Sequence, residues 1–181
     1  MREGMYHYGD CAVLYRTNAQ SRLFEERFIT ASIPYKIVGG VNFYSRREIK
    51  DLLAYLKTID NAMDDLAVRR IINVPKRGIG ATTLSRVQDY ADENGLTFYN
   101  ALKMAEEIGT IGRASAIIRP FVMLIQSMRS KLPYISVSEL LKEIIEETGY
   151  VRELEAENTE EAQQRMENID ELISKAVTYE E

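Results

Sequence analysis

The sequence has no tryptophan, a single cysteine and a single histidine. One cysteine, Cys11, cannot form a disulfide within the chain, and Cys11 and His7 are too few to build a Cys/His metal site. Long apolar runs are also missing, since no stretch approaches the roughly 20 residues that a membrane-spanning helix needs. The N-terminus lacks the apolar centre of a signal peptide. These absences predict a cytoplasmic protein with no disulfide framework, no metal site and no membrane contact.

What the chain does contain is charge, and that charge is unevenly distributed. Of its 181 residues 45 % are hydrophobic, which is enough for the core of one mid-sized domain or two small ones. The formal net charge is −5, but residues 1–87 carry 14 lysines and arginines against 9 acids. Residues 88–181 carry 9 basic residues against 19 acids. The basic half is therefore the better candidate for contact with nucleic acid, and the acidic half for a solvated helical scaffold.

A small parallel β element is predicted at the N-terminus. Cys11–Tyr15 is a short apolar run typical of a buried strand, and Tyr35–Val38 is typical of a second one. Between them, Ser21–Ser32 has apolar residues at helical spacing, and Pro34 prevents that helix from continuing. A strand, a helix and a strand with short links favour a parallel pair joined by a crossover. Such a unit is one piece of a larger α/β sheet.

The rest of the chain is predicted to be helical, which makes the fold class mainly α. Ser45 with Glu48 matches a capping box at the start of one helix, and Ser136 with Glu139 matches another. Pro120 is expected to kink or split the helix around it. The predicted helices cover about residues 46–60, 64–72, 81–93, 97–107, 113–130 and 137–148, followed by one or two charged helices after Gly149.

The stretch from Asn73 to Leu84 predicts a helix, a tight glycine turn and a second helix. Gly78 and Gly80 flank Ile79, which can pack into the junction, and glycine allows close backbone approach and positive φ. The first amides of the second helix point outward with the positive end of its dipole. The turn therefore predicts a phosphate socket of the helix-hairpin-helix type, made by Lys76, Arg77, Gly78, Ile79, Gly80, Thr82 and Thr83. The alternative is an ordinary helix turn in which the glycines only form the corner.

A second polar cluster, Tyr15–Arg22, directly follows the first predicted strand. Ligands of open α/β sheets bind beyond the carboxyl ends of the strands. Arg16 can pair with a phosphate through two nitrogens, and Asn18 or Gln20 can bond base edges or sugar oxygens. The alternative is a polar loop in which Arg16 and Arg22 form surface ion pairs.

A third cluster, Phe43–Asp51, places Arg46 and Arg47 at the start of a helix, against the preference of the helix dipole. An anion or an acidic partner would offset this cost, and Glu48 and Asp51 could be such partners within the helix, with Asp51 at the i,i+4 position from Arg47. Phe43 and the following tyrosine could stack on bases, although aromatic residues at such a junction more often belong to the core.

Taken together and in this order, four segments closely resemble the UvrD/PcrA/Rep family of superfamily-one DNA helicases, in particular its PcrA-type members. The segments are Ala12–Arg22, Pro34–Gly40, Phe43–Asp51 and Ile72–Gly80. The similarity extends further, through Tyr150 and on to the run from Gln164 to Leu172. The combination is far more specific than any of its parts.

The resemblance implies that residues 1–61 are part of the second RecA-like motor domain and that residues 62–181 are the helical subdomain inserted within it. Members of the family bind ATP between two motor domains and move 3′→5′ along single-stranded DNA. The expected partners are therefore DNA, both single-stranded and duplex, and the remaining helicase domains. By position, Arg16 and Asn18 match residues that touch the single strand. The positions that match the region of the family that contacts duplex phosphates are Lys50, Gly78, Ile79, Gly80 and Thr83.

Several parts of such a motor have no counterpart in this sequence. It contains no Gly-x-x-x-x-Gly-Lys-[Ser/Thr] loop, no acidic Mg²⁺ motif and none of the family's later motifs. ATP and Mg²⁺ are therefore expected as cofactors of the full-length protein and not of this chain. The chain is expected to be a fragment that ends inside the inserted subdomain and does not hydrolyse ATP alone. Unpaired strand edges in such a fragment could pair between chains and give a dimer.

Two other functions stay open on the residues alone. A stand-alone helix-hairpin-helix module would bind duplex DNA through the glycine turn without a motor. A protein-interaction module would instead use the acidic helices from Ser138 to Glu181, with Arg152 and Glu153 among them, to bind a basic partner. An enzyme for small molecules is disfavoured, because one histidine, one cysteine and no clustered carboxylates leave few groups for acid–base catalysis.

Overall fold

The computed structural model describes residues 6–180, and over that range it consists of helices and connecting segments without any strand. The α-helices are α1 (Ser21–Thr30), α2 (Arg47–Asp60), α3 (Asp65–Ile71), α4 (Ala81–Glu93), α5 (Phe98–Lys103), α6 (Ala114–Lys131), α7 (Val137–Thr148), α8 (Tyr150–Glu157) and α9 (Glu160–Glu180). Short 3₁₀ helices lie between them: η1 (Tyr8–Asp10), η2 (Asn18–Gln20), η3 (Phe43–Ser45) and η4 (Gly109–Ile111).

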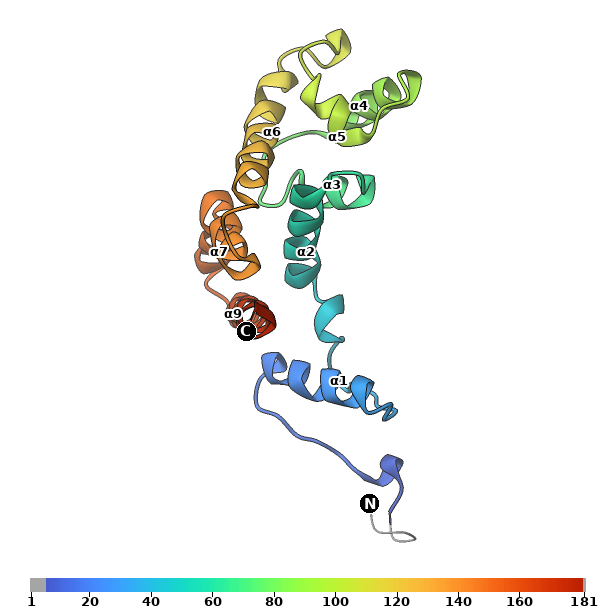
Figure 1. Ribbon diagram of the computed structural model, residues 1–181, viewed down its shortest axis with the longest axis vertical. Coiled ribbons are helices and arrows are strands. Elements are labelled where there is room, and N and C mark those ends of the chain that lie inside the picture. The colour runs from blue at the N-terminus through green and yellow to red at the C-terminus, as the bar shows by residue number, and fades with distance from the viewer. Residues whose placement is uncertain (1–5, 181) are drawn as a thin grey trace.

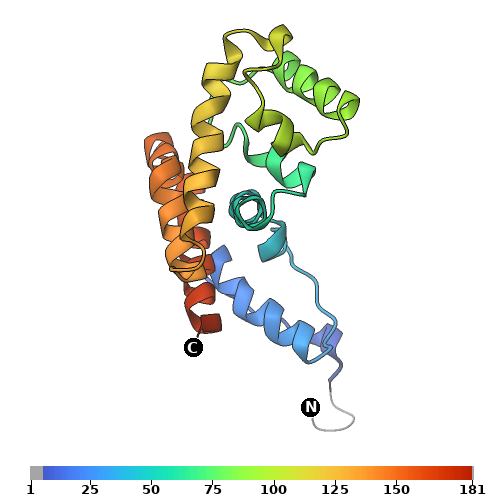
Figure 2. The same cartoon turned by 45° about the horizontal axis from the view of Figure 1, so that its top comes forward.

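The molecule is elongated, with the N-terminal residues at one end and α4 and α5 at the other (Figure 1). We call residues 6–42, which include α1, the arm, and residues 43–180 the helical body. Within the body α2 packs against α6 with their axes crossing steeply, since Figure 2 shows α6 lengthwise beside α2, which is seen nearly end-on. Within the body, the C-terminal helix α9 lies nearest the arm, and it contacts α2, α7 and α8 of the body and η2 of the arm.

The apolar core belongs to the helical body. Its cluster of buried side chains begins at Phe43 and ends at Leu172. Helix α2 is central to it, because Leu52, Tyr55 and Ile59 recur at helical spacing and are fully buried. The neighbours α3, α6, α7 and α9 pack around this helix. The core therefore fixes the relative positions of the body's helices, including the two that flank the glycine turn.

Most of the predicted helices are confirmed to within a few residues, and their ends have local physical causes. Asp64 caps α3 by accepting a hydrogen bond from the amide of Ala67, and Thr97 does the same for α5. The capping box of Ser136 and Glu139 is present at α7. Gly149 ends α7 with φ +71°, a conformation that favours glycine.

The predicted parallel β element at the N-terminus is wrong. Cys11–Tyr15 and Tyr35–Val38 contain no β-bridge, and apolar side chains in both segments face solvent, with Leu14 94 % and Val38 85 % exposed. Cys11 is exposed and not buried in a strand. A strand needs a neighbour that bonds its amides and carbonyls, and neither segment has one among the described residues. Without a sheet there is no sheet edge, so the predicted dimer through such edges is not supported.

Two local predictions in the body are also wrong. Ser45 and Glu48 do not form a capping box, because α2 begins one residue later, with Arg46 at its N-cap, and Glu48 bonds Asn168 of α9 instead. Pro120 does not split α6, which continues through it to Lys131. A proline inside a helix removes one backbone hydrogen bond, and apolar packing of residues such as Ile118 and Phe121 holds the helix together.

Over residues 6–180 no helix combines the length and the apolar composition that crossing a membrane requires. The same range holds no cluster of three or more histidine, cysteine or acidic side chains suited to a metal ion.

A buried carboxylate ties three helices of the body together. Asp51 of α2 accepts hydrogen bonds from Nε of Arg70 in α3 at 2.7 Å and from the hydroxyl of Tyr150 in α8 at 2.9 Å. Arg47 lies 3.9 Å from the same carboxylate, which confirms the predicted i,i+4 pair. Burial, followed by the negative charge of Asp51, raises the pKa of Tyr150 above the ordinary 10.0.

Tyr150 predicts how the fold responds to alkaline pH. Because its pKa is raised in the folded state, its contribution to the free energy of unfolding is complete below about pH 10 and declines as the pH rises beyond that. Replacing Tyr150→Phe should lower the free energy of unfolding at pH 8 by about 1–3 kcal/mol, since Asp51 loses a buried donor. It should also flatten the decline above about pH 10 in urea unfolding. The exposed Tyr134→Phe is the control, and an equally steep decline in both variants would contradict the assignment.

Candidate nucleic-acid interface

The glycine turn, residues 72–80, connects α3 to α4 and is closed by a side chain from its own start. Asn73 donates from Nδ2 to the carbonyl of Ile79 at 2.6 Å, and its Oδ1 accepts from the amide of Ile79 at 3.1 Å. Ile79 is only 4 % exposed and joins the core, as its place between two glycines predicted. The turn is therefore anchored to the body at Ile79, while Lys76, Gly78 and Gly80 are exposed.

The two glycines of the turn, Gly78 and Gly80, differ in backbone conformation. Gly78 has φ +78°, which other residues adopt only with strain. Gly80 has φ −72° and ψ 156°, an ordinary extended conformation. A Cβ added at Gly80 would meet nothing within 4 Å. The fold therefore requires glycine at position 78 but not at position 80, where the missing side chain leaves the backbone open to an approaching ligand.

Helix α4 begins at this open backbone without a side-chain cap. Gly80 is its N-cap, and the first internal bond is donated by Leu84 to the carbonyl of Gly80 at 3.1 Å. The preceding amides of the first turn, from Ala81 to Thr83, have no acceptor among the described residues. The first turn also carries no acidic residue. The positive end of the helix dipole is thus left for an external anion.

Arg77, predicted as part of the phosphate socket, is turned into the protein. Its Nη1 donates to the main-chain oxygens of Ile71 at 2.9 Å and Ile72 at 3.1 Å, with longer contacts to Val74 and Pro75. Its Nη2 donates to the hydroxyl of Tyr55 at 2.7 Å, and the guanidinium lies over the ring of Phe121. A guanidinium engaged in this way braces the turn and is not free to grip a phosphate. The cation that stays exposed at the turn is Lys76.

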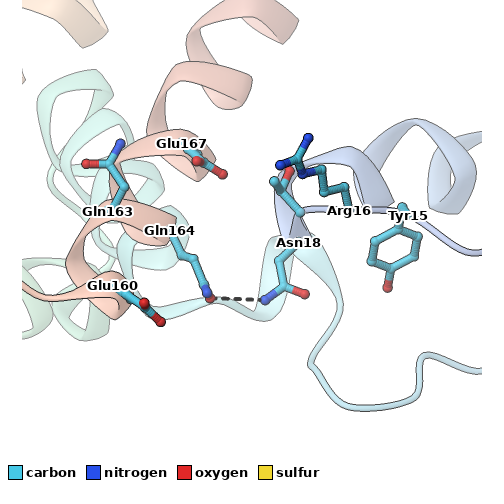
Figure 3. Close-up of a pocket in the computed structure, with 8 residues that line it drawn as sticks. Tyr15, Arg16, Asn18, Glu160, Gln163, Gln164 and Glu167 are labelled. Carbon is cyan, nitrogen blue, oxygen red and sulfur yellow. Dashed lines mark hydrogen bonds between the residues drawn. The ribbon is translucent and has the colours of Figure 1, made fainter.

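The polar cluster that starts at Tyr15 lies in another part of the molecule. Residues 15–18 form one wall of an open groove of about 290 Å³, and α9 forms the other with Glu160, Gln163, Gln164 and Glu167 (Figure 3). Asn18 donates from Nδ2 to Oε1 of Gln164 at 3.3 Å across this groove. Gln20 accepts from the amide of Arg16 at 3.0 Å. The side chain of Arg16 is exposed at the groove.

Ion pairing holds the second arginine of that cluster. Arg22 pairs with Glu26 at 3.0 Å and with Glu171 of α9 at 2.5 Å, as the alternative interpretation expected. Desolvation opposes the charge on Arg22, but its hydrogen bonds to the two glutamates outweigh this and raise its pKa. Arg22 is therefore part of the contact between the arm and α9.

The residues of the third cluster, Phe43–Asp51, lie in three environments: the core, the contact with the arm, and the surface. Phe43 is fully buried, with Arg46 over its ring at 5.1 Å, so it belongs to the core and not to a stacking surface. The hydroxyl of Tyr44 donates to Glu26 at 2.9 Å, and burial with this bond raises its pKa to about 12. Lys50 is exposed on the first turn of α2, and no described contact connects it with the turn or the groove.

The structure thus brings together Lys76, Gly78, Ile79, Gly80, Thr82 and Thr83 at one corner of the body. It places Arg16 and Asn18 at a separate groove beside α9. Sequence reasoning missed Asn73 and Tyr55, the two side chains that clamp and brace the turn. Asn73 lies directly before the motif and could have been found as an amide able to bond its own loop. Tyr55 comes from a distant helix and leaves no local signal.

Comparison with known proteins gives a consistent result along the whole chain. The model of the UvrD-like helicase C-terminal domain family matches residues 1–181. The chain is 45 % identical over 178 residues to the ATP-dependent DNA helicase PcrA of Bacillus subtilis (strain 168), covering 98 % of this chain and 24 % of the relative. It is 45 % identical over 187 residues to PcrA of Staphylococcus aureus (strain Mu50), covering 100 % of this chain and 26 % of the relative. The chain therefore spans about a quarter of the length of these relatives.

The two glycines of the turn should differ in their effect on stability. Gly78→Ala should lower the free energy of unfolding by about 1–2 kcal/mol, because alanine is strained at positive φ. Gly80→Ala should change it by less than about 0.5 kcal/mol, since φ is ordinary and the space around it is empty. Urea unfolding of both variants measures the difference. A large loss in Gly80→Ala would mean that this glycine serves the fold after all.

The inward position of Arg77 makes a separate prediction. Arg77→Ala should lower the free energy of unfolding by about 2–3 kcal/mol, because several carbonyls and the hydroxyl of Tyr55 lose a charged donor. Arg27→Ala, which removes an exposed arginine of α1 whose side chain has no described partner, is the control and should have a smaller effect. Equal stability of the two variants would contradict the inward position of Arg77 and make it a candidate phosphate contact again.

Proposed function

The chain belongs to the UvrD-like helicase C-terminal domain family, and from this premise we propose that it is a DNA-contacting part of an ATP-dependent DNA helicase. In this proposal the glycine turn binds a backbone phosphate of duplex DNA. The observation that carries it is the uncapped start of α4 behind Gly80, where no side chain blocks the backbone and no acidic residue occupies the first turn.

The chemistry of this corner suits a phosphate better than a base. Free main-chain amides at a helix start donate to an anion without regard to sequence. Lys76 adds a positive charge that is exposed at the same turn, and Thr82 and Thr83 add hydroxyls within the first turn of α4. These groups position a duplex without selecting its sequence, as a motor that travels along DNA requires.

We assign the second contact, with single-stranded DNA, to the groove between residues 15–18 and α9. Arg16 supplies the exposed guanidinium for a phosphate oxygen, and Asn18 supplies an amide that is already oriented by Gln164. Glu160 and Glu167 on the opposite wall make the groove mixed in charge. A strand would therefore contact the Arg16 side and leave the acidic wall to solvent. Lys50 is proposed as a separate, peripheral contact with the duplex.

ATP, Mg²⁺ and directional movement belong in this proposal to the remaining helicase domains. The arm offers a surface for those domains, because large apolar side chains of its extended segments and α1 are uncovered. They are Val13, Leu14, Leu23, Ile29, Val38 and Val41. Burial of such side chains is the ordinary driving force for packing against a partner.

A stand-alone helix-hairpin-helix module is the second candidate, and one observation favours it. Asn73, Tyr55 and Phe121, which close and brace the turn, all lie in the helical body. The turn is therefore closed and braced by residues of the helical body alone. The two candidates differ in whether the parent protein couples duplex contact at this turn to ATP hydrolysis.

Duplex binding should depend on the open backbone at Gly80. Gly80→Ala should weaken binding of the chain to a fluorescent blunt duplex about tenfold at low salt, because a methyl group displaces the phosphate from the amides. Binding by the unchanged chain should weaken as salt rises, since bound phosphates release counterions. Gly9→Ala, at another glycine with open surroundings, is the control. Equal affinity of the two variants at every salt concentration would remove the turn from the interface.

The role of Arg16 can be separated from that of the turn. Arg16→Ala should lower the affinity for a short single strand severalfold and leave duplex binding unchanged, because one charge-assisted contact is lost at a distant groove. Titration with oligonucleotides and with ATP, in the chain and in the full-length parent, shows whether the phosphate that Arg16 binds belongs to a DNA strand or to ATP. Reduced affinity for ATP with unchanged affinity for the strand would contradict the assignment to DNA.

A further inference from the structure

The contact between the arm and the helical body is built of polar side chains. Over the described residues, the apolar core cluster begins at Phe43 and takes no member from the arm. Apart from Ala19, the buried side chains of the arm are polar or charged: Ser21, Arg22 and Glu25. Hydrogen bonds and ion pairs to η3, α2 and α9, and not shared apolar packing, therefore hold the arm in place.

Arg46 lies at the centre of this contact and is itself buried. Its Nη1 donates to Oδ1 of Asn168 in α9 at 2.7 Å. Its Nη2 donates to the main-chain oxygen of Asn18 at 2.8 Å and to Oγ of Ser21 at 2.7 Å. One planar guanidinium thus spans the distance between α9 and the loop that carries Arg16.

Asn168 accepts a hydrogen bond from Arg46 because its side-chain amide is held in one orientation. Its Nδ2 donates to Oε1 of Glu48 at 2.6 Å, which leaves its oxygen facing the guanidinium. On the other side, Oγ of Ser21 donates to Glu25 at 2.7 Å, and Glu25 accepts from the amide of Phe43. Every member of this buried chain has a partner, and a fully connected polar network of this kind is rigid.

The network lies directly behind the groove. The carbonyl that Arg46 holds belongs to Asn18, which lines the groove with Arg16, and Asn168 follows Glu167 of the opposite wall by one residue. A change in the network therefore moves both walls relative to each other. No other described hydrogen bond ties the main chain of residues 15–18 to the helical body.

We propose that Arg46 and Asn168 are positioning residues that fix the loop of residues 15–18 against α9 and thereby set the ability of Arg16 to bind a phosphate. The inference rests on the proposed role of Arg16. It goes beyond that role by assigning two buried residues, separated by 122 positions in the sequence, to the same site.

A swap of donor and acceptor tests the network. Asn168→Asp keeps an acceptor for Arg46 but places a second carboxylate against Glu48, with no donor between them. Adding Glu48→Gln restores a donor and the original net charge of the pair. Asn100→Asp, the same exchange on α5, where the side chain has no described hydrogen bond, is the matched control. Hydrogen–deuterium exchange of residues 16–21 reports on the loop, and titration with an oligo-dT strand reports on binding.

In Asn168→Asp we expect exchange in residues 16–21 to accelerate about fivefold or more, as for the loss of one buried hydrogen bond, and the affinity for the strand to fall by a similar factor. Exchange in α4 and α6 should not change, and Glu48→Gln should restore both readouts. Unchanged exchange in the single variant, or no rescue in the double variant, would overturn the inference. If exchange follows this pattern while neither Asn168→Asp nor Arg16→Ala alters strand binding, the loop is positioned as inferred and the role of Arg16 is wrong.

Discussion

The placement of the arm against the helical body depends on the buried guanidinium of Arg46, which bonds Asn18 and Ser21 of the arm and Asn168 of α9. No residue before Phe43 belongs to the apolar core, so the arm is placed by polar contacts, which reach residues 43–46 and α9. A buried guanidinium is costly to desolvate, and burial lowers the pKa of Arg46. That cost is offset by the three hydrogen bonds that the guanidinium donates, and these bonds hold α9 and the arm in one relative position.

Arg46 and Arg77, which the sequence did not distinguish from exposed arginines, form hydrogen bonds inside the protein. Their positive charges are therefore not available at the surface. Arg77 closes the carbonyls at the end of α3, and Arg46 closes the contact between the arm and α9. Of the basic residues that the sequence suggested as DNA contacts, those that stay exposed are Lys76 at the turn and Arg16 at the groove, with Lys50 apart from both. The proposed interface relies on main-chain amides more than on side-chain charge, which is consistent with a net charge of −5 for the chain.

Local signals in the sequence predicted the helical body well. Caps such as Asp64 and Ser136, and the stop at Gly149, act within a few residues, so helix ends could be placed without knowledge of the fold. The burial of Ile79 and the pair of Arg47 with Asp51 were likewise short-range. The strands failed because a strand depends on a neighbour, and the apolar runs at Cys11–Tyr15 and Tyr35–Val38 have none within residues 6–180. The inward position of Arg77 and the link from Arg46 to Asn168 depend on helices distant in sequence, so no local pattern predicts them.

The central claim is that the open backbone at the start of α4 meets a duplex phosphate. Nuclear magnetic resonance of the ¹⁵N-labelled chain, titrated with a short blunt duplex at low salt, tests it most directly. The account predicts that the amide signals of Gly80, Ala81 and Thr82 shift most, that the shifts saturate, and that added salt reverses them. Shifts confined to α9 or to the arm, with the signals of residues 80–82 unchanged at saturating duplex, would contradict it.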